Sequence, residues 1–117
     1  MALADLTEPA ELNLKMVAGD SFQRSIIIQD SDKVAIDLTG LTGRADIRER
    51  PAGKLLTTFS VSIPTPANGT VIFSLNTTQT RALPGSSVWD LELDGGTNNT
   101  HTIVTGTVKV IPDVTVA

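Results

Sequence analysis

The chain of 117 residues contains no cysteine, which excludes disulfide crosslinks, thiol catalysis and thiolate metal ligands. Aromatic residues are also scarce, at 3% of the chain, and tyrosine is absent. Sugar-stacking platforms, antibody-like binding loops and single-stranded nucleic-acid grooves all depend on aromatic faces. The chain therefore has little material for any of these three kinds of surface.

Positive charge is in deficit, because 9 basic residues stand against 13 acidic ones and give a formal net charge of −4. A nucleic-acid-binding protein needs a basic surface to replace the counterions of the phosphates, so this balance argues against that function. No apolar run approaches the roughly 18 residues of a membrane-spanning helix. The first basic residue is Lys15, so the opening residues lack the charged region of a signal peptide. We expect one folded domain with no nucleic-acid or membrane partner.

Threonine, valine and isoleucine dominate what is present, and these β-branched residues favour strands. Apolar residues alternate with polar ones in many short runs, which is the pattern of strands buried on one face. The run from Leu55 to Ile63 is the clearest, with an apolar residue or threonine at every second place. The predicted strands cover 12–16, 22–29, 44–49, 55–63, 71–75, 88–93 and 100–111, with a short strand or edge segment at 34–36.

One short helix is expected near residues 77–83. A threonine or asparagine at its start can cap the first amides, and Pro84-Gly85 ends it. Asn68-Gly69 is a strong signal for a tight turn before the strand at 71–75. No helix of 10–15 residues separates successive strands, which disfavours a parallel α/β sheet.

These elements predict an all-β protein, a single antiparallel β-sandwich of about seven to eight strands, immunoglobulin-like or jelly-roll-like. We divide the one domain into an N-terminal arm plus first strand at 1–18, the sandwich at 19–112 and a C-terminal tail at 113–117. Residues up to Glu11 and from Asp113 onward have no predicted partner strand. We therefore expect these two segments to be arms.

The search for catalytic residues finds none. His101 is the only histidine, so it can complete neither a multi-histidine metal site nor a hydrolytic triad without nearby partners, and we expect a surface or loop histidine. Asp90 and Glu92 share a strand face, which we expect to be the solvent side opposite Trp89. The glycines form no phosphate-binding pattern. The sequence predicts a protein that is not an enzyme and has no cofactor.

Asp30, Asp32 and Asp37 form the best carboxylate cluster, and calcium favours oxygen ligands at close spacing. The cluster lacks the loop glycine and terminal glutamate of a helix-loop-helix calcium site. Aspartates also favour hydrogen bonds with nearby backbone amides. We therefore expect a solvated turn rather than a metal site.

Several short segments, taken in order, resemble a family of small β-sandwich domains in tailed bacteriophages and prophages. In that family a strand start of the form GD-x-F is followed by the segment DLTG, a strand ending in IR, an LPxG turn, an aromatic-Asp-Leu-Glu-Leu strand and a late G-x-V; at the turn this chain has Leu-Pro-Gly. The resemblance covers roughly Gly19 to Val114, with tryptophan at the aromatic position that is often tyrosine in the family. The matching segments are Gly19-Asp20-Ser21-Phe22 with Arg24, Ile36-Asp37-Leu38-Thr39-Gly40, Ala45-Asp46-Ile47-Arg48, Gly69-Thr70-Val71, Thr77-Thr78-Gln79-Thr80 with Leu83-Pro84-Gly85, Trp89-Asp90-Leu91-Glu92-Leu93 and Gly106-Thr107-Val108.

The resemblance implies a structural part of the virion, located in the tail, baseplate or fibre-attachment region or in capsid decoration as a cement protein. Its implied partners are other virion proteins and further copies of itself, as a trimer or hexamer. No catalytic residues carry over. The runner-up is a carbohydrate- or calcium-binding module, which needs an exposed Trp89 and an ion held by Asp30, Asp32 and Asp37. We expect Trp89 to pack in the core, since Leu91 and Leu93 share its face.

Overall fold

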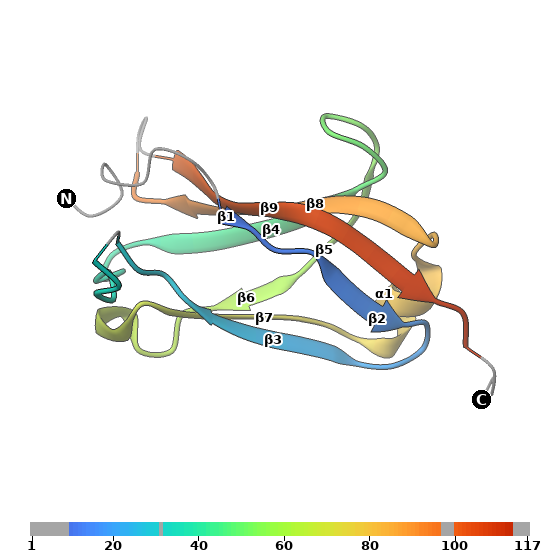
Figure 1. Cartoon of the computed structure of the whole chain (residues 1–117), viewed down its shortest axis with the longest axis horizontal. Coiled ribbons are helices and arrows are strands. Elements are labelled where there is room, and N and C mark those ends of the chain that lie inside the picture. The colour runs from blue at the N-terminus through green and yellow to red at the C-terminus, as the bar shows by residue number, and fades with distance from the viewer. Residues whose placement is uncertain (1–9, 31, 97–99, 114–117) are drawn as a thin grey trace.

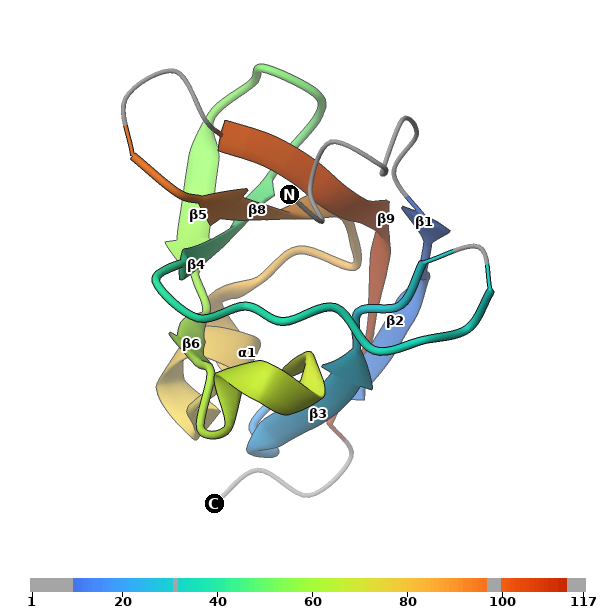
Figure 2. The same cartoon turned by 90° about the vertical axis from the view of Figure 1, so that its left-hand side faces the viewer.

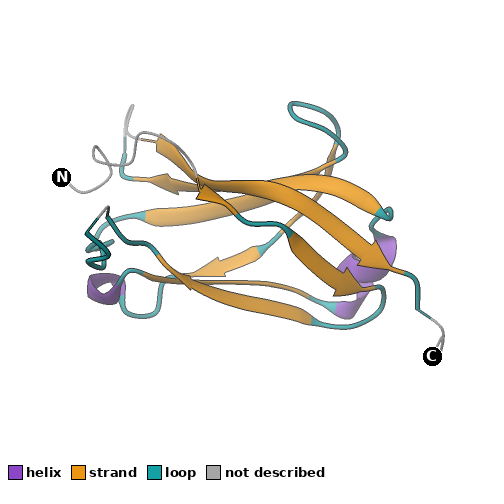
Figure 3. Ribbon diagram, in the orientation of Figure 1, coloured by secondary structure: helices purple, strands orange, loops and turns teal. Residues whose placement is uncertain are grey.

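The computed structural model describes residues 10–30, 32–96 and 100–113, which form two facing β-sheets (Figure 1). The larger sheet runs in the order β1, β9, β8, β4, β5, with β2 also paired to β9; the smaller runs β3, β7, β6. Strands dominate the molecule and the two short helices lie at its ends (Figure 3). The all-β sandwich predicted from the sequence is confirmed. The strands are β1 (Ala10–Glu11), β2 (Leu14–Val17), β3 (Phe22–Ile27), β4 (Thr42–Arg48), β5 (Leu55–Thr58), β6 (Ser60–Ser62), β7 (Thr70–Leu75), β8 (Ser86–Asp94) and β9 (Thr100–Ile111).

The strand order is that of an immunoglobulin-like sandwich. Such folds place the strands named B, E and D in one sheet and G, F and C in the other, to which variable-type domains add C′. Here β3, β7 and β6 take the B, E and D positions, and β9, β8, β4 and β5 take the G, F, C and C′ positions. This order selects the immunoglobulin-like alternative over the jelly roll.

The N-terminal segment overturns two predictions: that residues up to Glu11 form an arm, and that the sandwich is wholly antiparallel. Strand β1 pairs in parallel with β9 through Ala10 opposite Val104, and β2 continues the parallel pairing up to Val17 opposite Ile111. Residues 10–11 therefore belong to the larger sheet, because the last strand offers them a free edge that a local pattern cannot reveal. The remainder of the expected N-terminal arm, residues 1–9, lies outside the described residues.

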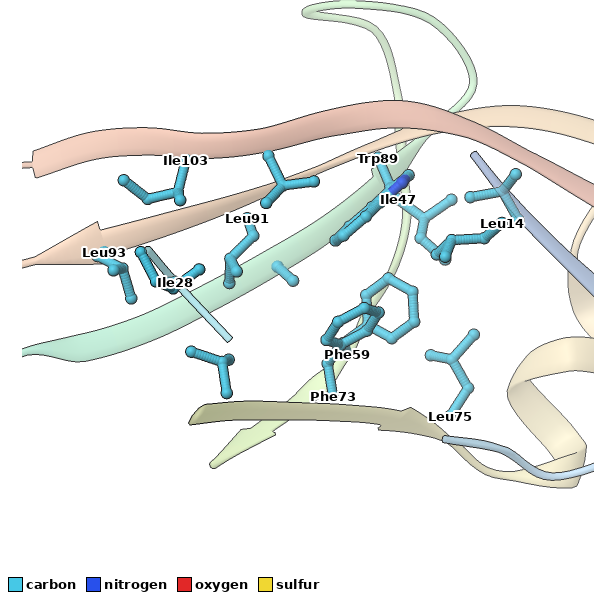
Figure 4. Close-up of a cluster of buried hydrophobic side chains, with 14 of the residues drawn as sticks. Leu14, Ile28, Ile47, Phe59, Phe73, Leu75, Trp89, Leu91, Leu93 and Ile103 are labelled. Atoms are coloured by element: carbon cyan, nitrogen blue, oxygen red, sulfur yellow. The ribbon is translucent and has the colours of Figure 1, made fainter. Parts of the chain in front are cut away.

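The aromatic side chains of the protein, three phenylalanines and one tryptophan, pack together in one cluster, in which Phe22 alone is half-buried. The rings of Phe73 and Trp89 stack with centroids 5.0 Å apart, and Phe59 makes T-shaped contacts with both rings at 5.2 and 5.7 Å (Figure 4). Phe22 extends the cluster, 6.2 Å from Phe59. Aromatic pairs at these distances add about 0.5–1.5 kcal/mol each beyond their burial. The cluster joins the two sheets in a sandwich that has no disulfide.

The predicted strand at 55–63 is two strands in different sheets. Strand β5 pairs with β4 in the larger sheet, and β6 pairs with β7 in the smaller one. Phe59 stands at the change, with its amide still bonded to the Ala45 carbonyl at 2.8 Å. Leu55, expected to face inward, is 40% exposed. The alternation is preserved while the chain crosses between layers, so sequence periodicity alone does not reveal the crossing.

The last strand contains a bulge that shifts its inward face. Leu91 pairs with Val104 while Glu92 pairs with Thr102, so Ile103 is an extra residue in β9. Val104, Val108 and Val110 are buried, and Ile103 is buried beside them. The bulge brings the odd-numbered positions inward at the start of the strand.

The short helix and the tight turn predicted from the sequence are both present. Helix α1 (Thr77–Ala82) begins at the N-cap Asn76, whose side chain exchanges hydrogen bonds with Gln79 as a capping box. A 3₁₀ turn, η2 (Pro66–Asn68), ends at Gly69 with φ of 69°. The segment expected as a strand at 34–36 forms only an isolated bridge between Ala35 and Gln29. Within the described ranges, neither helix is of a length and apolarity that would let it cross a membrane.

Candidate interaction surfaces

The aspartates proposed as calcium ligands form local turns. Asp30 Oδ1 accepts hydrogen bonds from the amides of Asp32 and Val34 at 2.9 and 3.1 Å. Asp37 Oδ1 accepts from the hydroxyl and the amide of Thr39 at 2.6 and 3.0 Å, and these bonds lower the pKa of the Asp37 carboxyl. No group of three or more potential metal ligands occurs among the residues that the structure describes. The turn predicted for these aspartates is confirmed.

Trp89 is a core residue, as predicted. Its side chain is 3% exposed, and its ring packs against those of Phe59 and Phe73 (Figure 4). The indole Nε1 donates to the Leu12 carbonyl at 2.8 Å. Because both the face and the polar atom of the ring are occupied, Trp89 offers no platform for stacking on a sugar.

His101 lies near the start of β9, opposite Leu93 of β8, and is half-buried. It belongs to no metal-binding group in the described parts of the chain. The strand predicted at 100–111 already includes this position, and β9 begins at Thr100.

The outer face of the larger sheet carries a groove of about 690 Å³. Asp46 and Arg48 of β4 and Asp90 of β8 line it, and the turn between β4 and β5 forms a rim at Pro51 and Ala52. That turn projects beyond the sheet (Figure 1). We call this surface the outer groove. Its polar walls are carboxylates and an arginine on neighbouring strands.

Two carboxylates of the outer groove are direct cross-strand partners, Asp46 on β4 and Asp90 on β8. The negative charge of Asp46 is compensated by two arginines. Its carboxylate accepts hydrogen bonds from Arg44 Nε at 3.2 Å and from Thr58 Oγ1 at 2.9 Å, and the Arg48 guanidinium lies 3.7 Å away. Burial raises the pKa of Asp90, and the charges of Glu92 and Asp46 raise it further against the opposing effect of Arg48. The predicted solvent side of β8 is therefore partly enclosed, and its pairing with β4 adds a third carboxylate, Asp46, that no short sequence window shows.

The second surface is the edge of the smaller sheet formed by β3. Strand β3 pairs with β7 along one side, and no described strand pairs with its other side. Figure 2 shows β3 at the border of its sheet, on the side where β2 borders the larger one. A groove of about 330 Å³ lies between β3 and β1, lined mainly by apolar residues. We call it the edge groove (Ala10, Leu12, Ile26, Ile27, Ile103 and Val104).

Segments that carry the phage resemblance contact one another across long stretches of sequence. The amide of Gly19 donates to Thr80 Oγ1 at 3.0 Å, and that hydroxyl donates to the Asp20 carbonyl at 2.8 Å. Gly106 lies against the indole of Trp89. The resembling segments therefore meet as turns and packing contacts.

Sequence reasoning missed three features of these surfaces. The approach of Leu12 to Trp89 depends on the bare backbone at Gly106, and only the glycine itself signals it. The Asp46–Asp90 pair and the edge groove depend on the pairing of strands that are distant in sequence. Tertiary pairing of this kind leaves no local pattern.

No protein-family model matches the chain, and no curated protein matches it. Among solved structures, the chain is similar to Tim-1, with 10% identity, 94% of this chain and 100% of that chain covered, and a TM-score of 0.50. It also matches the filamin domain of Lin-41, with 17% identity, coverage of 83% and 82%, and a TM-score of 0.48. A third match is the immunoglobulin-like domain of mouse leukocyte-associated immunoglobulin-like receptor 1, with 15% identity, coverage of 90% and 92%, and a TM-score of 0.48. The likeness to Tim-1 and the strand order agree on the fold: the chain is an immunoglobulin-like β-sandwich.

Proposed function

We propose that the chain is a non-enzymatic structural protein of a bacteriophage virion. In this role it is a small β-sandwich connector of the tail, baseplate or fibre-attachment region, or a cement protein that decorates the capsid. The observation that carries the proposal is the ordered set of resembling segments, supported by the contacts between Gly19 and Thr80 and between Gly106 and Trp89. These contacts place the resembling segments in one packed unit of the sandwich.

The use of the polar side chains supports a structural role. Asp30 and Asp37 shape turns, Asp46 neutralises Arg44, and Arg81 holds Asp113 at 3.1 Å beyond the end of β9. These side chains make contacts that fix loops and the exit of the chain. Such a protein acts through its strand edges and its terminal segments, as strand-adding and arm-exchanging proteins do.

The proposed partners are other virion proteins, namely tail or baseplate proteins or the major capsid protein, and further copies of the chain in a trimer or hexamer. Residues 1–9 are the proposed N-terminal contact segment, shortened from 1–11 because Ala10 and Glu11 are part of β1. The carbohydrate- and calcium-binding alternative has no supporting observation, since it requires an exposed Trp89 and a gathered carboxylate cluster.

Quantitative mass spectrometry of purified phage particles tests the proposal. The particles come from a lysogen or infected culture that encodes the chain, and a density gradient separates them from soluble protein. We expect the chain to remain with the particles, at a copy number near that of the capsid protein for a cement protein and far below it for a tail part. Recovery of the chain only in the soluble fraction would refute the virion role. Immunogold labelling then separates head from tail.

A further inference from the structure

The backbone of β3 presents hydrogen-bonding groups along its open edge. The amide of Ile28 donates to the Gly69 carbonyl at 2.8 Å, so Ile28 faces the β7 side of the smaller sheet. Antiparallel pairing alternates this direction from residue to residue, and β3 pairs with β7 without a bulge. The N–H and C=O groups of Gln23, Ser25, Ile27 and Gln29 therefore point away from β7.

Other strands at the borders of the described sheets are short or interrupted. Strand β6 has three residues and β5 has four, with an irregular register beside it. The border formed by β1 and β2 is broken at Leu12 and Asn13, whose carbonyl and side chain bond Trp89 and Thr107. Strand β3 has six residues, contains no proline and is continuous. Long, regular edges of this kind are the ones that pair with another chain.

The side chains at the β3 edge are also apolar enough to be buried against another chain. Ile27 is 56% exposed, one of the largest exposures of an apolar side chain among the described residues. Ile26 is half-buried and faces the edge groove, whose other wall is Leu12, Ile103 and Val104. A strand added beside β3 would continue the inner face of the smaller sheet, so its inward side chains would enter the edge groove. Main-chain bonds then supply affinity and the groove selects the side chains.

We propose that this occupant is β3 of a second copy, added antiparallel about a two-fold axis at Ile26. This register pairs the outward-facing residues 23, 25, 27 and 29 with 29, 27, 25 and 23 of the second copy. Ile26 lies opposite itself and can enter the edge groove of the second copy. The result is a continuous six-stranded sheet built from two smaller sheets.

Charge disfavours the two registers that would bring the Arg24 side chains of the two copies closest together. Arg24 is exposed and is the charged residue of β3. A two-fold axis at Arg24 would place the two guanidinium groups directly opposite, and an axis at Ser25 would leave them diagonal neighbours; like charges so placed are destabilising. With the axis at Ile26, Arg24 lies opposite Ile28 and the two arginines stand at opposite ends of the paired segment. The contact is independent of the virion role, and combined with a three-fold axis it would build a hexamer.

Sedimentation equilibrium of the full chain tests the pairing. A single strand edge buries less than a standard interface, so we expect a dimer with a dissociation constant of about 10–1000 μM. Ser25→Pro removes an outward N–H at an edge position where proline is compatible with a strand, and should weaken the dimer at least tenfold. Ser25→Ala keeps the N–H and should dimerise like the wild type. Circular dichroism checks that each variant is folded, and Gln23→Pro serves if Ser25→Pro does not fold.

Cysteine crosslinking tests the register, because the protein has no thiol of its own. Residues opposite one another in a non-hydrogen-bonded antiparallel pair have Cα atoms about 4.5 Å apart, which a disulfide can span. Ile26→Cys should therefore form a covalent dimer under mild oxidation, and Ser62→Cys on β6 should not. A chain that stays monomeric at about 1 mM, a proline variant that dimerises unchanged, or equal crosslinking at both positions would overturn the proposal. Loss of the dimer on deletion of residues 1–9 would also overturn it, by assigning the contact to that segment.

Discussion

The indole Nε1 of Trp89 and the carbonyl oxygen of Leu12 form a 2.8 Å hydrogen bond between residues 77 positions apart. Strand β9 lies between β8, which carries Trp89, and the segment joining β1 and β2, which carries Leu12, and Gly106 is the β9 residue at the crossing. A Cβ atom at position 106 would collide with the Leu12 carbonyl and lie 3.1 Å from Nε1. The N-terminal strand can reach the tryptophan only because residue 106 has no side chain.

We expect Gly106→Ala to lower the free energy of unfolding by about 2 kcal/mol or more, because the added methyl group must displace the Leu12 backbone or the indole. Gly85→Ala is the matched control, since its Cβ would meet its nearest neighbour at 4.0 Å. That control should stay within about 0.5 kcal/mol of the wild type. Urea denaturation measures both variants. Equal stability of the two would contradict the close approach.

Trp89 is the single tryptophan, so its fluorescence reports on one site. Because the ring is 3% exposed and packed against two phenylalanines, we expect a blue-shifted emission with little quenching by iodide. Unfolding in urea should shift the emission to the red and restore quenching. A red-shifted, readily quenched emission from the folded protein would instead support an exposed sugar-binding platform.

Thr80 connects helix α1 to the turn between β2 and β3. It is fully buried, and its hydroxyl bonds both the Gly19 amide and the Asp20 carbonyl. Thr80→Val keeps the shape but leaves those two groups without a partner, which should cost about 1–3 kcal/mol. Thr80→Ser keeps the hydroxyl and should recover most of the loss. If valine and serine proved equally stable by urea denaturation, the hydroxyl would have no such role.

The raised pKa of Asp90 predicts a pH-dependent stability. The folded protein binds this proton more tightly than the unfolded chain does, so the free energy of unfolding falls as pH rises from the ordinary aspartate pKa through the raised one. Asp90→Asn should therefore stabilise the protein at pH 7, by less than about 1 kcal/mol because solvent screens the partly exposed group. The advantage should disappear below about pH 4. Urea denaturation across this range measures it.

Asp37 supplies the control of opposite sign, since hydrogen bonds from Thr39 lower its pKa. Its stabilising effect is present above the ordinary aspartate pKa and is lost as pH falls through the lowered one. Asp37→Asn should thus reduce stability at pH 7.

A second check on Asp90 is Glu92→Gln, which removes a charge beside Asp90 and should narrow the pH range over which Asp90 affects stability. The same pH profile for all three variants would contradict this assignment.

Local sequence patterns predicted the elements that depend on residues close together in the sequence. The alternation at 71–75 and 88–93 gave the correct inward faces, since Val71, Phe73, Leu91 and Leu93 are fully buried. The capping signal at Asn76 located α1, because a cap is a contact within one turn. These features depend on neighbours in sequence, which is why the sequence alone could predict them.

Features that depend on distant partners could not be predicted. The change of sheet at Phe59 preserves the alternation, and the bulge at Ile103 is defined by its register against β8. The candidate surfaces belong to this second class: the outer groove needs β4 beside β8, and the edge groove needs β1 beside β3. The aspartate turns, by contrast, were predicted, because Asp30 and Asp37 bond amides within four positions.

The parallel pairing of β2 with β9 also has a consequence for the order of folding. Leu14 pairs with Val108 and Val17 with Ile111, so these contacts join residues 94 positions apart. During synthesis, the border formed by β1 and β2 cannot take its place until Ile111 has left the ribosome. Contacts between segments so distant in sequence form slowly, because a long loop must close first. We therefore expect the first strands to dock last, onto a sandwich that the rest of the chain has already assembled.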